Sequence, residues 1–388
     1  MDAQTFWLEN LGRFKTLNEL RQSTFFAVHG KQIESYLRTP QVLSVSGVSP
    51  VLHSFVRVVQ WNIEKGKRFP AILELLQTNE ILKMADVIIL NEADRGMARS
   101  SNRNVVAELA EALRMHAVFG AAHFELTKGV DEELLLDGPN GESQQGNAIL
   151  SRYPIAEAGI VPLPATFEPY EFHEKRYGSR ICLWARLQLK DAPLWVGAVH
   201  LELRNTPRCR AKQVRHIVQH LPCTDSEAVI LGGDLNTNTF GRGTRWRTLN
   251  AILRLLLNAP AKLQKELLYP NLVDEPLFRI LESGGFEWNR MNSNEETART
   301  SIDSLEEAGW LPDPVLRLFK RRLEPYRGFL CFKLDWLLGK NIAALGAGQK
   351  RDSGAGALSV NPGAVKAENF GPDRLSDHLP IYADLDLS

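Results

Sequence analysis

Apolar residues recur along this chain in two rhythms, one typical of strands and the other typical of helices. The runs FVRVVQWNI (55–63) and ADVIILNEA (85–93) are short and rich in β-branched residues, which predicts two buried strands. Apolar residues fall at helical spacing between these runs, from Phe69 to Met84, and again from Asn104 to Met115. The pattern therefore predicts strand, helix, strand, helix.

Further strand patterns follow, and most of them are separated only by turns. They are AVFGAAHFEL, GNAILSRY, ICLWARLQL, LWVGAVHLEL and AVILGGDLN, with a helical pattern from Arg208 to Leu221 before the last. Strands joined by turns pair antiparallel. We therefore expect an α/β (α+β) protein in which two stacked, largely antiparallel β-sheets are flanked by helices.

Two segments lie outside this scaffold. Residues 1–50 carry helically spaced apolar residues and end in the linker-like SVSGVSP, which predicts an N-terminal helical extension. Residues 51–388 would form the main domain, interrupted at about 240–327 by a largely helical insertion. The Gly- and Ala-rich residues 343–365 predict a mobile loop before the final strand.

Composition restricts the class of protein without naming a substrate. Of the 388 residues, 44% are hydrophobic and 24% are charged, which is the composition of an ordinary globular protein. The 46 basic and 46 acidic residues balance, which counts weakly against a protein that coats nucleic acid without regard to sequence. The four cysteines are scattered without zinc-ligand spacing, as expected of buried thiols. MDAQTFWLEN lacks the features of a secretory signal, and no apolar run reaches the roughly 18 residues that span a bilayer. We expect a cytoplasmic protein with no obligate protein partner.

Polar residues suited to catalysis stand at the ends of six predicted strands. A single Asp or Asn after a strand is usually a turn residue, and a single His is usually a satisfied core residue. Asp335 is different, because a carboxylate within the apolar run LDWLL is costly to bury without a partner. The repetition favours a site made of Asn62, Glu64, Glu92, Asp94, His200, Asp234, Asn236, Asp335, Asp377 and His378.

These residue types suit phosphate-ester chemistry with a hard metal ion. Carboxylate and amide oxygens such as those of Glu92, Glu64, Asp377 and Asn62 favour Mg²⁺ or Mn²⁺ over zinc. The sequence has neither the His-Glu-x-x-His pattern of zinc proteases nor the P-loop of nucleotide-driven enzymes. Metal, imidazole and carboxylate together can neutralise phosphoryl oxygens and activate a water.

With these segments identified, the chain resembles the endonuclease/exonuclease/phosphatase superfamily, whose branches include deoxyribonucleases, exonuclease III-like nucleases, inositol polyphosphate 5-phosphatases and sphingomyelinases. The resemblance runs from about Phe55 to the C-terminus. It is carried in order by QWNIE, ILNEAD, GNAILSRYPI, AVHLE, GGDLNT, KLDWLL and LSDHLPI. It implies a four-layered sandwich and hydrolysis of a phosphate ester by activated water.

The resemblance also implies roles for single residues. Glu92 matches the principal metal ligand, Asn62 the asparagine beside metal and phosphate, and Asp377 the aspartate that completes the metal site; Glu64 is a further candidate ligand. His378 matches the catalytic histidine, and Asp335 its carboxylate partner. Asp234 and Asn236 match residues that activate water and stabilise the transition state. Phosphate contacts are implied for His200 and, by a looser match, for Arg180. Arg204 is a further candidate for substrate binding, because it follows the motif AVHLE.

The sequence leaves the substrate open between nucleic acid and lipid. Arginines follow three of the motifs and could line a groove for a polyanion, which slightly favours a nuclease: Arg95, Arg99 and Arg103; Arg204, Arg208 and Arg210; Arg242, Arg245 and Arg247. The alternative is a sphingomyelinase-like phospholipid phosphodiesterase or a phosphoinositide phosphatase, for which Trp246, Leu253 and Leu255–Leu257 could supply apolar contacts. A catalytically silent binding module on the same fold is the third interpretation.

Overall fold

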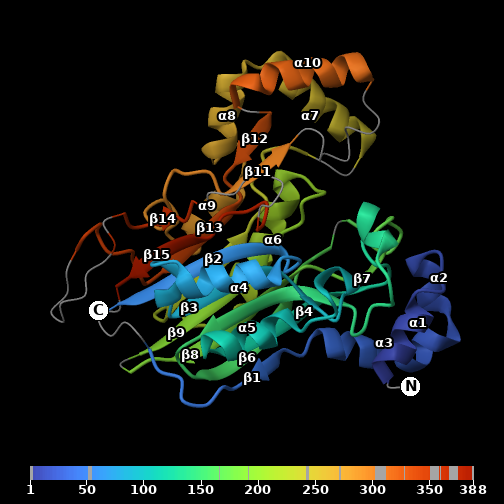
Figure 1. Ribbon diagram of the computed structural model, residues 1–388, viewed down its shortest axis with the longest axis horizontal. Helices are drawn as coiled ribbons and strands as arrows, with labels where there is room; N and C mark the ends of the chain where they lie inside the picture. Colours follow the sequence, from blue (N-terminus) through green and yellow to red (C-terminus); the bar gives the residue numbers. More distant parts are fainter. Residues whose placement is uncertain are drawn as a thin grey trace.

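The structure is a computed structural model that describes residues 3–50, 55–165, 167–190, 192–241, 244–270, 272–301, 312–326, 328–349, 358, 360–366 and 375–386. Figure 1 shows a layered body from which a smaller group of helices and strands projects. Within the described residues the body contains two sheets, one of eight strands and one of five.

The eight-stranded sheet combines strands from the N-terminal half with the end of the chain. Its order is β1 (Gln41–Leu43), β4 (His116–Glu125), β5 (Gln144–Ser151), β3 (Val87–Arg95), β2 (Val56–Lys65), β15 (Ile381–Leu385) and β14 (Gly363–Ala364), with β7 (Arg176–Gly178) also paired to β4. The five-stranded sheet has the order β13 (Asp335–Lys340), β10 (Ala228–Asp234), β9 (Pro193–His200), β8 (Ile181–Gln188) and β6 (Ile155–Pro162).

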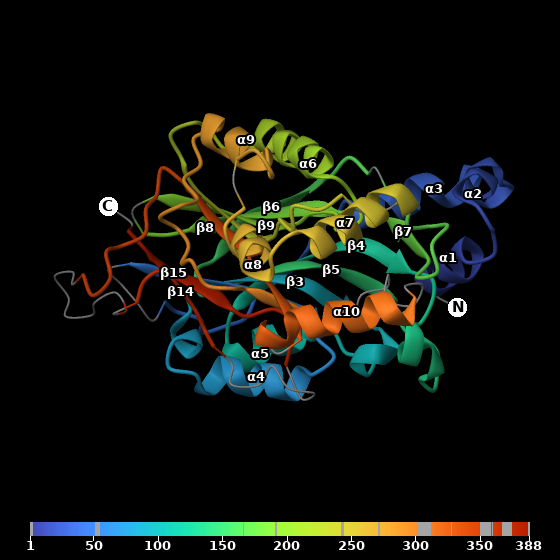
Figure 2. The same ribbon diagram turned by 90° about the horizontal axis from the view of Figure 1, so that it is seen from above.

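Helices cover the outer faces of both sheets. In Figure 2, α6 (Pro207–His220) and α9 (Leu277–Ser283) lie on the five-stranded sheet, and α4 (Phe69–Thr78) and α5 (Val105–Leu113) lie on the far side of the eight-stranded sheet. Short 3-10 turns are η1 (Leu82–Met84), η2 (Ala98–Ser100), η3 (Asp131–Leu135) and η5 (Glu324–Tyr326). The expected α/β (α+β) architecture of two stacked sheets between helices is confirmed (Figure 2).

Strand periodicity explains why the layers hold together. Along β3, Ile88 and Leu90 join the apolar cluster under α4 and α5, while Ile89 points the other way into the core between the sheets. On the outer face of the five-stranded sheet, Val229 packs in the same cluster as Phe278 of α9. Each sheet therefore buries both faces, which is why its strands appear as nearly continuous apolar runs.

Two pairs of neighbouring strands are parallel, and both are joined by a crossover helix. β2 and β3 are connected through α4, and β9 and β10 through α6. The other strand pairs in the two sheets are antiparallel. In a parallel pair both carboxyl ends lie at the same edge, so this connectivity decides where the polar strand ends meet.

The N-terminal segment folds as α1 (Ala3–Leu11), α2 (Leu17–Gln22) and α3 (Thr24–Leu37). Leu11, Leu20 and Ile33 are buried in the same cluster as the outer face of the eight-stranded sheet, and β1 pairs with β4. These helices therefore share the core of the main body. Of the four cysteines only Cys182 is buried and the others are partly exposed, so the expectation of four buried thiols was wrong for three of them.

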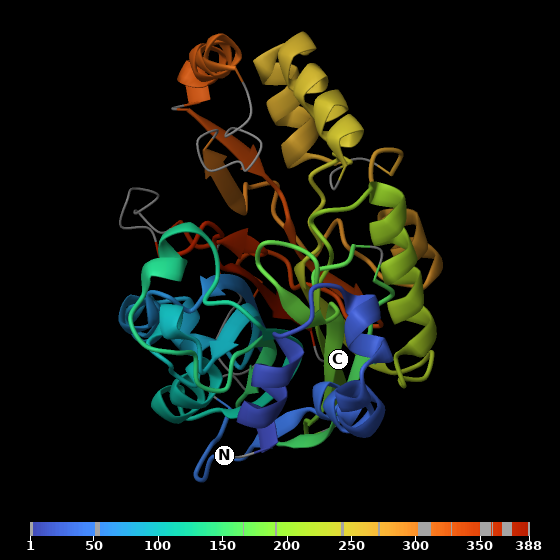
Figure 3. The same ribbon diagram turned by 90° about the vertical axis from the view of Figure 1, so that its right-hand side faces the viewer.

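The insertion is divided between the projection and the body. The projection contains α7 (Arg245–Leu257), α8 (Pro260–Leu268), α10 (Asp313–Leu323) and the ribbon of β11 (Ala298–Ser301) and β12 (Phe329–Phe332), packed around its own apolar cluster. Figure 3 shows these elements standing above the sheets. The intervening α9 instead packs against α6 in the body.

The last strand and the loop before it were also predicted from the sequence. The last strand begins at Ile381 rather than at Asp377, because residues before Pro380 turn away to contact β11, where His378 bridges to Ala298. Much of the predicted loop at 343–365, namely 350–357 and 359, lies outside the described residues. No helix among those described combines the length and apolar character needed to cross a bilayer.

Candidate active site

Strand register brings the predicted polar residues together at one edge of the two sheets. In the parallel pair β2–β3, Asn62 lies opposite Asn91, the residue before Glu92. In the parallel pair β9–β10, His200 lies opposite Asp234, and Asp335 of β13 is the partner of Asp234 on its other side. These register positions define the candidate site.

Irregular backbone at the strand ends aims these side chains. Register shifts interrupt β2–β3 after Asn62 and β3–β5 after Leu90, and Glu92 adopts φ +55° there. Bulges of this kind redirect side chains and are frequent beside functional sites. Before Asp234, Gly233 has φ +153°, and a Cβ there would lie 1.7 Å from the carbonyl oxygen of Val199. Only glycine allows β10 to approach β9 this closely.

The carboxylate of Asp234 is the centre of the site. Its Oδ2 accepts a hydrogen bond of 3.3 Å from Asn62 Nδ2, and the same amide nitrogen lies 3.3 Å from Oε1 of Glu92. His200 Nε2 lies 3.4 Å and His378 Nε2 3.8 Å from Asp234 Oδ2. Residues from four strands and the C-terminal segment therefore meet around one carboxylate.

His378 is paired with a buried acid. Its Nδ1 donates to Oδ2 of Asp335 over 2.7 Å, and Gln60 Nε2 donates to the other oxygen of Asp335 over 3.1 Å. Burial disfavours the charged imidazole, but Asp335, Asp377 and Asp234 outweigh it and hold the pKa of His378 well above its ordinary value. The pair leaves a protonated Nε2 facing Asp234.

His200, in contrast to His378, is held in its neutral form. Arg180 Nη1 donates to Nδ1 of His200 over 2.9 Å, so Nδ1 is an acceptor and the proton of the neutral ring is on Nε2. Burial, and then the positive charge of Arg180, lower the pKa of His200 well below its ordinary value. The site thus holds one neutral and one protonated imidazole.

Asp234 and Glu92, the two carboxylates that Asn62 links, also differ in the direction of their pKa shifts. Burial, reinforced by the charges of Asp335 and Glu92, raises the pKa of Asp234 to about 7. Burial also acts on Glu92, but Lys65, Arg180 and His378 outweigh it and lower the pKa of that carboxyl. Glu92 is therefore the permanent anion, whereas Asp234 can exchange a proton near neutral pH.

The sequence profile of the Endonuclease/Exonuclease/phosphatase family matches residues 59–378, a span that contains every residue of this site. The chain belongs to this family. Its members are hydrolases of phosphoester bonds and generally depend on divalent metals. Among curated proteins no sequence matches this chain.

Solved structures of the family are distant from this chain. An endonuclease/exonuclease/phosphatase from Beutenbergia cavernae DSM 12333 is 19% identical, with 86% of this chain and 72% of that chain covered and a TM-score of 0.49. The catalytic domain of human Nocturnin with bound sulfate is 14% identical over 90% and 97% of the two chains, with a TM-score of 0.48. A family protein from Leptotrichia buccalis C-1013-b is 13% identical over 86% and 100%, with a TM-score of 0.47.

Four of the residues named from the sequence have other contacts. Asn236 lies two residues after Asp234, and its side-chain amide donates a hydrogen bond to the carbonyl of Leu201. The Oε1 atom of Glu64 lies 3.8 Å from Nζ of Lys67.

The guanidinium of Arg204 lies over the ring of Phe172. Asp377 accepts a backbone hydrogen bond from Arg299 and acts electrostatically on His378, its neighbour in the chain. Their predicted metal and substrate contacts stay predictions.

Three buried amides that support the site were missed by the sequence reasoning. Asn91 Oδ1 accepts from the backbone nitrogen of Asp234 over 2.8 Å and from Gln60, and Asn91 Nδ2 donates to Asn147. Asn147 in turn donates to backbone carbonyls of β8 and β9. These amides join the two sheets beneath the residues of the candidate site. The available signal was a polar residue inside an apolar run, the signal that did identify Asp335.

The donor set suits a hydrated hard cation. Within the residues that the structure describes, no group of three or more His, Cys, Asp or Glu side chains is arranged to hold a metal. Mg²⁺ does not require such a cage, because it keeps several waters and takes one or two carboxylates. The ionised, partly exposed Glu92 provides such a carboxylate, and it is held in place by Asn62.

The prediction of three arginine clusters that line a groove was wrong for Arg99 and Arg210. Arg99 and Arg210 are buried in ion pairs, Arg210 with Glu275. Arg95 and Arg103 also pair with acids, Glu142 and Glu108. Arg242 lies outside the described residues. Of the nine arginines that suggested a polyanion groove, Arg99 and Arg210 are therefore buried in ion pairs, and Arg95 and Arg103 pair with acids that are partly exposed.

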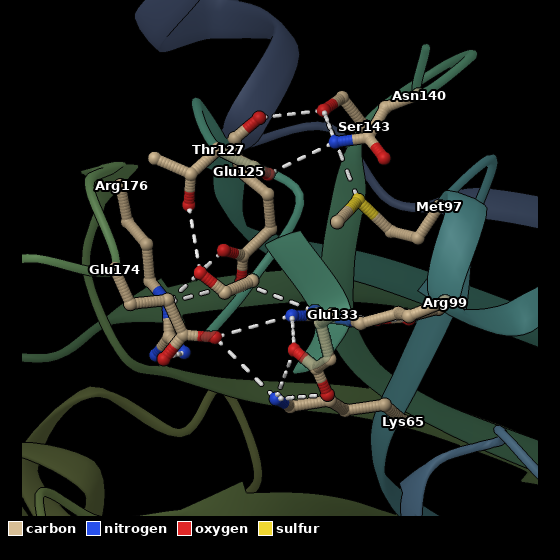
Figure 4. Close-up of polar contacts among 12 residues, drawn as sticks. Lys65, Met97, Arg99, Glu125, Thr127, Glu133, Asn140, Ser143, Glu174 and Arg176 are labelled. Atoms are coloured by element: carbon tan, nitrogen blue, oxygen red, sulfur yellow. Dashed lines mark hydrogen bonds and ion pairs between the residues drawn. The ribbon is translucent and has the colours of Figure 1, made fainter. Parts of the chain in front are cut away.

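Arg99 is the centre of a buried charge network beside the site. It makes two hydrogen bonds to Asp94, of 2.8 and 3.0 Å, and lies 3.4 Å from Glu125 and 3.1 Å from Glu174. Figure 4 shows Lys65, Glu133, Glu174 and Arg99 pointing toward one another. Because Lys65 also lowers the pKa of Glu92, the network connects the loops around the site to its electrostatics.

Arg99→Leu should be strongly destabilising. It leaves Asp94 and Glu125 buried beside an apolar side chain, and we expect the free energy of unfolding to fall by about 3–5 kcal/mol. Arg38→Leu is the matched control, because Arg38 makes an exposed pair with Glu34 and should cost less than about 1 kcal/mol. Urea denaturation of both variants checks this, and equal losses would show that the network contributes no more than a surface pair.

Proposed function

We propose that this protein is a magnesium- or manganese-dependent phosphoesterase that hydrolyses a phosphodiester or phosphomonoester by direct attack of an activated water. The observation that carries the proposal is the meeting of Glu92, Asp234 and the His378–Asp335 pair around one point at the edge of both sheets. Few other chemistries need an ionised carboxylate that an amide links to a carboxylate titrating near neutrality, with a protonated imidazole 3.8 Å from the latter.

Each residue has a role that follows from its protonation. Asp234 would accept a proton from the attacking water, for which a pKa of about 7 is well suited. His378 would present its Nε2 proton to a phosphoryl oxygen, while Asp335 holds the ring and its charge. The neutral His200 and Arg180 would contact the phosphate from the β9 side. Bound at Glu92, the metal would neutralise charge on the non-bridging oxygens.

The class of substrate is a separate question. A nuclease was slightly favoured by nine arginines, four of which pair with acids of the protein, so this preference loses part of its support. A phospholipid phosphodiesterase and a phosphoinositide phosphatase remain as alternatives, and the exposed surface described below favours lipid. A catalytically silent binding module is the alternative of a different class. The presence of Glu92, Asp234 and His378 together argues against it.

The metal requirement can be tested on a small soluble ester. With bis(p-nitrophenyl) phosphate and Mg²⁺ or Mn²⁺, we expect release of p-nitrophenol that EDTA reduces to background and that excess metal restores. Activity that resists EDTA would contradict the metal requirement. Metal-loaded protein that leaves this ester, nucleic acids, phosphoinositides and sphingomyelin all intact would instead support the silent module.

A further inference from the structure

Helix α7 exposes an apolar stripe in addition to the apolar face that it buries. Trp246 is 77% exposed, Leu249 43%, Leu253 43% and Leu257 81%. Their spacing of three, four and four residues places them along one face of the helix. Ala251 and Leu256 of the same helix pack on the apolar cluster of the projection. We call the exposed face the α7 stripe.

The helices of the projection are strongly basic. α7, α8 and α10 carry three, two and four Lys or Arg residues and none, one and one acidic residues, respectively. Arg247, Arg317, Lys320 and Arg321 are exposed. In a chain whose basic and acidic residues are equal in number, this charge is concentrated on the part that stands away from the body (Figures 1 and 3).

Apolar and basic groups together select an anionic lipid surface. A phosphodiester backbone would be attracted to the basic side chains, but it offers nothing to exposed leucines. Helices with Trp and Leu on one face and Lys and Arg beside them bind at the boundary between lipid head groups and acyl chains, most strongly where the lipids are anionic. An exposed apolar stripe of this extent otherwise has an unfavourable contact with water.

The projection is attached directly to the candidate site. Arg254 of α7 donates two hydrogen bonds of 3.1 Å to Thr239, three residues after Asn236. Thr297, immediately before β11, accepts the backbone N–H of Asp335 through its hydroxyl. Docking of the projection on a surface therefore fixes the position of the site relative to that surface.

We propose that the α7 stripe and the basic side chains of α10 form a docking surface for an anionic phospholipid bilayer, and that the phosphate ester cleaved at the site belongs to a lipid of that bilayer. The second half of this proposal rests on the proposed phosphoesterase function, whereas the docking itself does not. Trp246 and Leu257 are the side chains expected to enter the lipid, since they are the most exposed of the stripe.

Sedimentation with sucrose-loaded vesicles tests the docking in EDTA, which prevents hydrolysis. We expect the full chain to sediment with phosphatidylcholine vesicles that contain 30% phosphatidylserine, in proportion to vesicle concentration, and far less with pure phosphatidylcholine. Trp246→Ser combined with Leu257→Ser should weaken this partition by about tenfold or more, because two large apolar side chains no longer enter the lipid. A thermal melt of the variant checks that folding is unchanged.

The matched control is Leu135→Ser. Leu135 is 82% exposed, yet it lies among Asp131, Glu132 and Asp137, whose charges an anionic bilayer repels, so its loss should leave partition unchanged. Full chain that stays in the supernatant, or a double variant that sediments like the full chain, would overturn the docking proposal. So would an oligonucleotide that displaces the protein from vesicles and binds the double variant equally well, because the surface would then serve nucleic acid.

Measurements of hydrolysis distinguish a failure of the docking proposal from a failure of the proposed phosphoesterase function. Bis(p-nitrophenyl) phosphate should be cleaved equally by the full chain and by the double variant, whereas release of head groups from vesicle phospholipid should fall in the double variant alone. If neither protein cleaves the soluble ester although the full chain sediments with vesicles, the phosphoesterase function fails and docking stands. If both cleave it and neither sediments, docking fails and the function stands.

Discussion

Replacing His378 by alanine is expected to lower the kcat for a phosphodiester by about 100- to 10,000-fold, the range that a positioned proton donor contributes. The imidazole is buried, its Nδ1 is held by Asp335, and its Nε2 faces Asp234, so its proton is held at a fixed position in the site. Steady-state kinetics with bis(p-nitrophenyl) phosphate and Mg²⁺ would measure the loss. KM should change much less than kcat.

The control for this variant is His220→Ala. His220 is an exposed residue at the end of α6, and its removal subtracts the same side chain without touching the site. Turnover within a factor of about three of the unmodified chain is expected for the control. If His378→Ala kept a similar rate, proton donation would have to come from elsewhere, and the assignment of the site would fail.

Sequence reasoning named residues that lie together in the structure, because strand ends have a local signature. Asn62, Glu92, His200 and Asp234 each follow an apolar run, and residues at the carboxyl ends of parallel neighbours meet without any further information. Asp335 could be identified for the opposite reason, since a carboxylate within an apolar run needs a partner. The partner is His378, 43 residues further along the chain.

What the sequence could not provide was long-range pairing. Arg99 and Arg210 resemble groove-lining arginines because they follow catalytic motifs, but their partners Glu125, Glu174 and Glu275 are tens of residues away, and only the fold shows that they are enclosed. Each such arginine contributes to internal charge balance rather than to a surface field. The nuclease preference failed to gain support for this reason.

Exposure was the other quantity outside the reach of sequence. The leucines and tryptophan of α7 fit either a core helix or a surface helix, because an apolar pattern does not say which neighbours are present. In the structure α7 is apolar on more than one face and buries only part of that surface. Trp246, Leu253 and Leu257, which the sequence offered as possible contacts for a lipid, are exposed, whereas Leu256 packs on the apolar cluster of the projection.

Asp335→Asn is expected to lower kcat by about 100- to 10,000-fold with little change in KM. The side chain keeps its size, and one oxygen can still accept from Gln60 or from His378, so the packing of this fully buried residue is retained. What is lost is the negative charge that stabilises the protonated ring and fixes its orientation. The measurement is again steady-state kinetics, with circular dichroism to confirm that the variant is folded.

Asp225→Asn separates the loss of this charge from the loss of any carboxylate in the same sheet region. Asp225 pairs with Lys340 at the surface, and its side chain is fully exposed, so kcat should be unchanged. A result in which Asp335→Asn lowers thermal stability but keeps kcat would make Asp335 a structural partner of His378 rather than a positioning residue. Loss of kcat at unchanged stability is the outcome that the geometry requires, because the ring that Asp335 orients is the protonated imidazole of the site.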